Sequence, residues 1–214
     1  MKPILIITVN FNDYEYFKEF NDLPNKNKVD WIYITDNNNL RSNFWNIKYL
    51  KDFPKVNQLT DNRLKTKYFK MLTHKLFPNY QYYFWMDASV NITNNNFINN
   101  LLNYIPKQLV IYRHNRAFPP SRNIIIEKDV CIKLGLVDKN KAESQINKYL
   151  KDNFPFKYKL YSCGIIFRKN NPKINKLFNK WYQHNVIYTT RDQLSLPYLL
   201  WKHNIKPDLI IKKI

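Results

Sequence analysis

The chain has 214 residues, 44% of them hydrophobic, and a formal net charge of +19 at pH 7. This length supports one hydrophobic core and is short for two independent domains, so we expect a single domain over residues 1–214. Its two cysteines are too few for the disulfide framework of a small secreted fold, and neither belongs to a C-x-x-C metal or redox motif.

Three continuous apolar and β-branched segments predict strands that are buried on both faces, namely 3–9, 30–36 and 82–86. The first segment is too short for the core of a signal peptide. No segment approaches the roughly 18 apolar residues of a membrane span, so we expect no transmembrane segment. Weaker strand patterns occupy 45–49, 109–113, 160–168 and 209–212.

Helical patterns alternate with these strands. Residues 61–77 carry a cap at Thr60 or Asp61, apolar residues at helical spacing and a stop at Pro78. Further helices are expected over 97–104, 141–151, 172–184 and, with a kink at Pro197, 192–203. This alternation predicts an α/β fold with a mostly parallel central sheet flanked by helices.

Polar residues directly follow three of the predicted strands. The first strand is followed by Asn10 and Asn12, with the aromatic Phe11 between these two amides. The second is followed by Asp36, and the third by Asp87 and Ser89, with Ala88 between them. In open α/β sheets, ligands bind beyond the carboxyl ends of the strands. The two glycines, Gly135 and Gly164, belong to neither a dinucleotide fingerprint nor a P-loop, so side chains or a metal must hold any phosphate.

Asp87 ends a strongly apolar strand, where a carboxylate is costly unless it is paired, hydrogen-bonded or bound to a metal. With Ser89 two residues later, it offers hard oxygen ligands for Mg²⁺ or Mn²⁺ bridging a diphosphate. The alternative is an ordinary aspartate that starts a turn.

Basic residues mark two further candidate positions. Arg63 and Lys67 lie four residues apart on one face of the predicted helix, which suits a diphosphate but also an ordinary solvated face. The segment 112–122 holds three of the seven arginines, including Arg116, together with His114. It is a candidate for binding donor phosphates or an anionic acceptor, or for pairing with carboxylates such as Glu127.

Arg191 and Asp192 open the last predicted helix. Arg191 is a further candidate for contacting phosphate or acceptor. Asp192 either complements the helix dipole as a first-turn acid or removes the proton of an acceptor hydroxyl as a general base. Among the other histidines, only His203 is retained as a residue that could complete a metal site.

In this order, the segments resemble a glycosyltransferase of the GT-A fold. The sequence is most similar to small giant-virus transferases that decorate capsid proteins and to the related plant and bacterial family formerly of unknown function. The resemblance spans nearly the whole chain and rests on 10–12, 31–36, 61–67, 85–89, His114 with Arg116 and Glu127, and 191–195.

The resemblance implies a role for each group of residues. Around the nucleotide it places Asn10, Phe11, Asn12 and Asp36. Arg63 and Lys67 would face the diphosphate, Asp87 would anchor the metal, and Asp192 would lie near the transferred sugar. The chain departs from the Asp-x-Asp pattern of typical members at Ser89, whose neutral hydroxyl gives less charge to a metal.

These expectations combine into a glycosyltransferase that uses Mn²⁺ or Mg²⁺. It would transfer a hexose or deoxyhexose from a nucleoside diphosphate sugar to a glycan or glycoprotein acceptor. The expected donor is a UDP-sugar. We expect a cytoplasmic protein, in the host cytoplasm if it is viral, without specific nucleic-acid binding. The alternatives are a metal-dependent hydrolase and a basic nucleic-acid-binding module, although only seven of the 35 basic residues are arginine.

Overall fold

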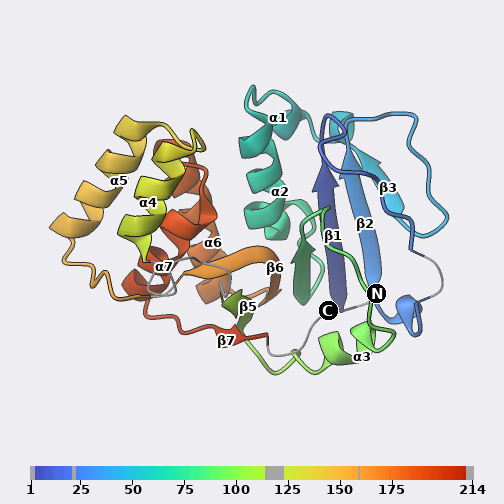
Figure 1. Cartoon of the computed structure of the whole chain (residues 1–214). Helices are drawn as coiled ribbons and strands as arrows, with labels where there is room; N and C mark the ends of the chain where they lie inside the picture. Colours follow the sequence, from blue (N-terminus) through green and yellow to red (C-terminus); the bar gives the residue numbers. More distant parts are fainter. Residues whose placement is uncertain (1–2, 21–22, 114–122, 159, 211–214) are drawn as a thin grey trace.

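A seven-stranded β-sheet runs through the computed structural model, which describes residues 3–20, 23–113, 123–158 and 160–210 (Figure 1). Its strands are β1 (Ile4–Asn10), β2 (Asp30–Thr35), β3 (Asn46–Tyr49), β4 (Tyr82–Met86), β5 (Leu109–Arg113), β6 (Tyr161–Lys169) and β7 (Asp208–Leu209). The α-helices are α1 (Pro54–Asn57), α2 (Asn62–Leu76), α3 (Phe97–Leu102), α4 (Ile124–Lys133), α5 (Lys139–Lys151), α6 (Pro172–Ile187) and α7 (Asp192–Lys202). Short 3₁₀ helices occupy Lys26–Lys28 and Leu50–Asp52. The predicted α/β class is confirmed.

The strands follow the order β3-β2-β1-β4-β6-β5-β7. The pairs from β3 to β4 are parallel, and β5 is parallel to β7, whereas β6 runs antiparallel to both of its neighbours. The expectation of a mostly parallel sheet is therefore confirmed, with β6 as the exception. Within the described residues, no helix has both the length and the apolar character needed to cross a membrane.

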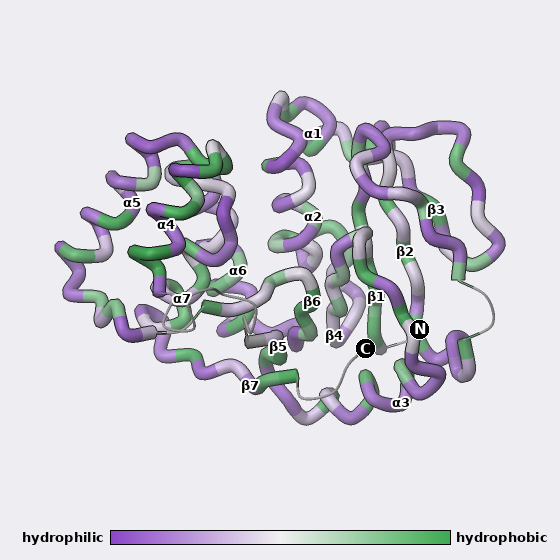
Figure 2. The backbone as a smooth tube through the Cα atoms, in the orientation of Figure 1, coloured by the Kyte–Doolittle hydropathy of each residue, from purple (hydrophilic) through white to green (hydrophobic). Residues whose placement is uncertain are grey.

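The sheet buries side chains on both of its faces. Every residue of β1 is buried, and alternate positions enter different clusters: Leu5 and Ile7 pack in one, Ile4 and Ile6 in the other. This explains the continuous apolar run, because a strand covered on both faces has no polar side to expose. In Figure 2 the tube along α5 alternates between hydrophobic and hydrophilic colours, which is typical of an amphipathic helix on an outer layer.

The short helix α1 and the longer helix α4 were not predicted, and strand β7 has other bounds than expected. Helix α4 was not predicted, because its opening Ile-Ile-Ile run lacks the helical alternation of apolar and polar residues. Strand β7 is shorter than the predicted 209–212 and begins one residue earlier, while the residues beyond 210 lie outside the described part. Pro197 lies inside α7, as expected.

Helix α2 reaches the centre of the molecule and packs against α6. The Asp61 carboxylate accepts hydrogen bonds from the backbone N–H groups of Arg63 and Leu64, at 2.7 and 3.2 Å, which confirms the predicted cap. At Leu72 the backbone leaves helical geometry (φ −103°, ψ 21°), and the buried Arg168 guanidinium donates to the Met71 carbonyl at 3.3 Å. The turn before this kink carries the basic residues of the site.

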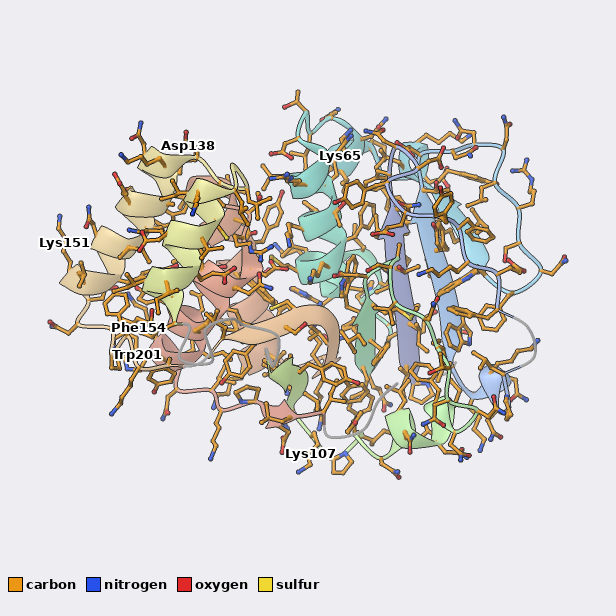
Figure 3. The ribbon with its side chains drawn as sticks, viewed as in Figure 1. Lys65, Lys107, Asp138, Lys151, Phe154 and Trp201 are labelled. Carbon is orange, nitrogen blue, oxygen red and sulfur yellow. The ribbon has the colours of Figure 1, made fainter. Side chains whose placement is uncertain are left out.

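Helix α7 is fixed at its C-terminal end by aromatic packing. Phe154 and Trp201 lie side by side in Figure 3, with ring centroids 5.5 Å apart. The Tyr149 and Tyr198 rings stack at 3.8 Å in the same cluster. This packing holds the C-terminal end of α7 against α5 and the segment that follows it. The N-terminal end of α7 lies against α2.

Candidate active site

The carboxyl ends of β2, β1 and β4 lie next to one another, as the sequence prediction required. The chain passes from β1 to β2 on one side, while β4 lies on the other, so the direction of strand order changes between β1 and β4. Such a switch point is where open α/β sheets form a crevice for ligands. Asn10 and Asp87 stand at the two sides of this point.

The loop after β1 is tied to the end of β2. The backbone N–H of Asn12 lies 3.0 Å from both carboxylate oxygens of Asp36. The buried Asn10 amide accepts from the Glu15 backbone N–H at 3.1 Å and donates to the Glu15 carbonyl at 2.6 Å. Asn12 and Asp13 both adopt positive φ values, 56° and 48°, which non-glycine residues rarely do. These contacts fix the loop at the edge of the switch point.

Asp87 is held by its neighbours while its side chain remains 44% exposed. The Trp85 indole N–H donates to Asp87 Oδ1 at 2.6 Å, and the Lys70 ammonium lies 3.6 Å from the same oxygen. The backbone N–H of Asp87 donates to the Gly164 carbonyl at 2.8 Å. The expectation that a carboxylate at this strand end needs partners is therefore met by an indole and an ammonium group.

Asp192 joins the same cluster from the first turn of α7. Its Oδ2 accepts from Lys67 Nζ at 2.6 Å and from Lys70 Nζ at 2.8 Å. The Asp192 and Lys70 side chains are only 7% and 3% exposed, and that of Lys67 is 16% exposed. Asp192 Oδ1 is buried and has no hydrogen-bond partner within the described residues. A buried carboxylate oxygen without a donor is costly, so this atom is suited to receive a hydroxyl from a ligand.

The charges of this cluster shift one another's protonation. Burial raises the pKa of Asp192, but the Lys67 and Lys70 ammonium groups outweigh burial and hold that pKa below its usual range. Burial alone would lower the pKa of Lys70, whereas Asp192 and Asp87 raise it above its usual range. The pKa of Lys67 lies below its usual value, mainly because the side chain is buried. The attraction of Asp192 raises this pKa and the Lys70 charge lowers it, so Asp192 offsets the effect of burial only in part. Asp192 is therefore ionised and a weak base.

Several predicted residues have other partners. Phe11 is buried and packs on Phe69, with ring centroids 6.0 Å apart, so its ring belongs to the core. Arg63 donates to the Leu136 carbonyl at 3.2 Å, whereas Lys67, four residues on, enters the carboxylate cluster. Ser89 is exposed, and its carbonyl accepts from Lys18 Nζ at 2.6 Å. Whether these residues contact a ligand stays a prediction.

The basic residues expected to bind phosphate or acceptor divide into two groups. Arg191 Nε and Nη2 both lie 3.0 Å from Oε1 of the buried Glu127, which anchors α7 to α4 directly before Asp192. His114 and Arg116 lie outside the described residues. His203 follows the last turn of α7, about 16 Å from Asp192 at 1.5 Å per residue, so its alternative role as a metal ligand gains no support.

Sequence reasoning missed the most central side chain, Lys70. A lysine is rarely fully buried unless it is paired, so its position on the inner side of α2 was not expected. Its spacing of three residues from Lys67 was an available signal, because such residues share a helix face. Trp85 and Gly164 were likewise not assigned to the site. Trp85 contacts Asp87, two residues later, through its indole N–H, and Gly164 reaches Asp87 through the pairing of β6 with β4.

A sequence profile described as "TOD1/MUCI70, glycosyltransferase-like domain" matches residues 13–213 of the chain. The chain is 22% identical over 173 residues to a protein named "Probable hexosyltransferase MUCI70" from Arabidopsis thaliana. That match covers 73% of this chain and 27% of the plant protein, so the chain spans about a quarter of its relative's length. The crystal structure of mouse xyloside xylosyltransferase 1, apo form, aligns with a TM-score of 0.48 and 9% identity, over 98% of this chain and 84% of that one.

Proposed function

The chain belongs to the TOD1/MUCI70 glycosyltransferase-like domain family, and on that premise we propose that it transfers a hexose or deoxyhexose from a UDP-sugar to a glycan or glycoprotein. The observation that carries this proposal is the convergence of Asp87 and Asp192 on Lys70 at the switch point of the sheet. The hexosyltransferase name of the plant relative supports the sugar class.

The two lysines supply positive charge where a diphosphate would leave. In glycosyl transfer, negative charge develops on the departing diphosphate as its bond to the sugar breaks. Preorganised cations aimed at such charge lower the barrier by several kcal/mol in a site that excludes water. Lys67 and Lys70 are fixed by Asp192, so they need little reorganisation during the reaction.

Asp192 has a second role, which is to hold the sugar. With its pKa held below the usual range, this carboxylate is a poor acceptor for the proton of an attacking hydroxyl. Its Oδ1, which has no partner in the described part of the chain, is better suited to accept a hydrogen bond from a hydroxyl of the donor sugar and to stabilise positive charge that develops on the sugar ring. These contacts favour the stabilising role over that of general base.

Asp87 and Ser89 would hold a divalent cation together with the diphosphate. Among the residues that the structure describes, no three His, Cys, Asp or Glu side chains gather closely enough to hold a metal on their own. The half-exposed Asp87 nevertheless fits Mg²⁺ or Mn²⁺, because such ions commonly bind through one or two carboxylates plus substrate phosphates. When bound, the ion would neutralise charge on the leaving diphosphate.

Thermal unfolding tests this proposal. We expect UDP with MnCl₂ at 100 times its dissociation constant to raise the melting temperature by about 5–10 °C, because a ligand that binds only the native state stabilises it. MnCl₂ alone is expected to give a small shift, since one carboxylate and one hydroxyl make a weak metal site without phosphate oxygens.

ADP with MnCl₂ serves as the matched nucleotide control. A shift that is equally large with duplex DNA, and that disappears as salt is raised from about 50 to 200 mM, would instead support the basic nucleic-acid-binding module. No shift with UDP, or one independent of the base, would argue against a UDP-sugar donor.

A further inference from the structure

Gly164 lies in strand β6 directly across from Asp87. Its carbonyl accepts the Asp87 backbone N–H at 2.8 Å, next to the antiparallel pair of Met86 and Ile165. A Cβ atom added at Gly164 would lie 3.1 Å from Asp87 Oδ2 and 3.7 Å from its Cγ. A glycine inside a strand weakens it, so such a residue commonly marks a place where another group approaches closely. Here the approaching group is a carboxylate oxygen.

The Asp87 carboxylate has little freedom to move away from that position. Its other oxygen, Oδ1, is held by the Trp85 indole N–H at 2.6 Å and faces the Lys70 ammonium at 3.6 Å. Lys70 itself is fixed by Asp192 and lies 5.4 Å from the centre of the Trp85 ring. Turning the carboxylate away from Gly164 would therefore weaken the contacts of Oδ1.

We propose that Gly164 and Trp85 are positioning residues for Asp87. The missing side chain of Gly164 leaves the space for Oδ2, and the Trp85 indole fixes Oδ1. Among the described residues Oδ2 has no hydrogen-bond partner, so it is the oxygen that Asp87 can offer to a ligand. The identity of the group that Oδ2 binds, a cation carried by a nucleoside diphosphate sugar, rests on the proposed function. The positioning itself does not.

The first test needs no ligand. Five tryptophans give up to five indole ¹H–¹⁵N NMR signals, and Trp85→Phe identifies the one from Trp85 by its loss. We expect Asp87→Ala to move this signal strongly, because the short hydrogen bond is removed. Gly164→Ala should move it in the same direction by a smaller amount, since the added methyl pushes Oδ2 and loosens the hold on Oδ1.

Gly135→Ala is the matched control. Gly135 adopts a positive φ of 65°, and a Cβ atom there meets nothing within 4 Å, so alanine strains the backbone without touching Asp87. The Trp85 signal should stay in place in this variant. A Trp85 signal that moves in Asp87→Ala but keeps its wild-type position in Gly164→Ala would overturn the proposal.

The second test measures UDP release from a UDP-sugar. Gly164→Ala should lower kcat/KM about 10-fold, because displacements below 1 Å at a reacting site commonly cost one to two orders of magnitude. Its melting temperature should change little, since the better fit of alanine to a strand offsets the cost of the contact with Oδ2. In an Asp87→Asn background, Gly164→Ala should cause no further loss of activity. An equal loss in both backgrounds would overturn the proposal, whereas absence of UDP release in the wild type would contradict only the proposed function.

Discussion

Asp87→Ala is expected to lower the rate of UDP release from a UDP-sugar by about 100- to 1000-fold. This is the range for the loss of one preorganised electrostatic contact to charge that develops in the transition state. The variant removes the carboxylate at the end of β4 but leaves Lys70 paired with Asp192 at 2.8 Å, so the fold should be kept. The measurement is the initial rate of UDP production at saturating donor, with and without MnCl₂.

Asp138→Ala provides the control for this prediction. Asp138 is an exposed aspartate that caps α5, where its carboxylate accepts from the Lys141 N–H at 2.8 Å (Figure 3). Its removal should destabilise the protein by about 1 kcal/mol and leave the rate unchanged. Wild-type activity in Asp87→Ala, or an equal loss in Asp138→Ala, would contradict the assignment of Asp87 to the site.

Asp192→Ala is expected to produce the largest loss of stability. The substitution leaves the ammonium groups of Lys67 and Lys70 buried without their shared carboxylate, and breaking a buried ion pair in this way costs about 3–5 kcal/mol. For a chain of this length, the melting temperature should fall by about 6–20 °C. Calorimetry or chemical unfolding measures this loss.

The pH dependence of that loss follows from the pKa of Asp192. The pKa of Asp192 is lower in the folded protein than its value of about 3.9 in the unfolded chain. The ion pairs therefore stabilise the protein fully above about pH 4, and this stabilisation is lost as the pH falls through the folded-state pKa. The difference in stability between wild type and Asp192→Ala should therefore shrink below about pH 4. A constant difference down to pH 2 would contradict this electrostatic explanation.

A compensating variant separates stability from activity at this cluster. Asp192→Leu with Lys67→Met and Lys70→Met replaces the buried charges by apolar side chains of similar size, which is often neutral for stability. We expect this triple variant to recover most of the lost melting temperature without recovering UDP release. Recovery of both would indicate that the cluster serves the fold alone.

The sequence predicted the parts of the fold that depend on local pattern. The apolar run Tyr82–Met86 has the predicted bounds, and Asp61 caps α2. Asp87 could be chosen because a carboxylate that follows such a strand needs a partner. The neighbouring ends of β1 and β4 could be expected because parallel strands place their carboxyl ends at one edge.

The remaining parts depend on contacts between segments far apart in the chain. The antiparallel pairing of β6 with β4 brings Gly164 to Asp87, and nothing in the local pattern of either strand specifies that pairing. The burial of Lys70 depends above all on Asp192, 122 residues later, whose carboxylate lies 2.8 Å from the Lys70 ammonium and offsets the cost of removing that charge from water. Helix α4 was missed because its isoleucines also suit a strand.

A crystal soaked with UDP and MnCl₂ tests the central claim, that Asp87 holds a cation against a diphosphate. Diffraction near the manganese absorption edge locates the ion independently of the rest of the structure. We expect an anomalous peak within bonding distance of Asp87 Oδ2, with the diphosphate between it and Lys67. Manganese bound elsewhere, or UDP bound away from the ends of β1 and β4, would contradict the account.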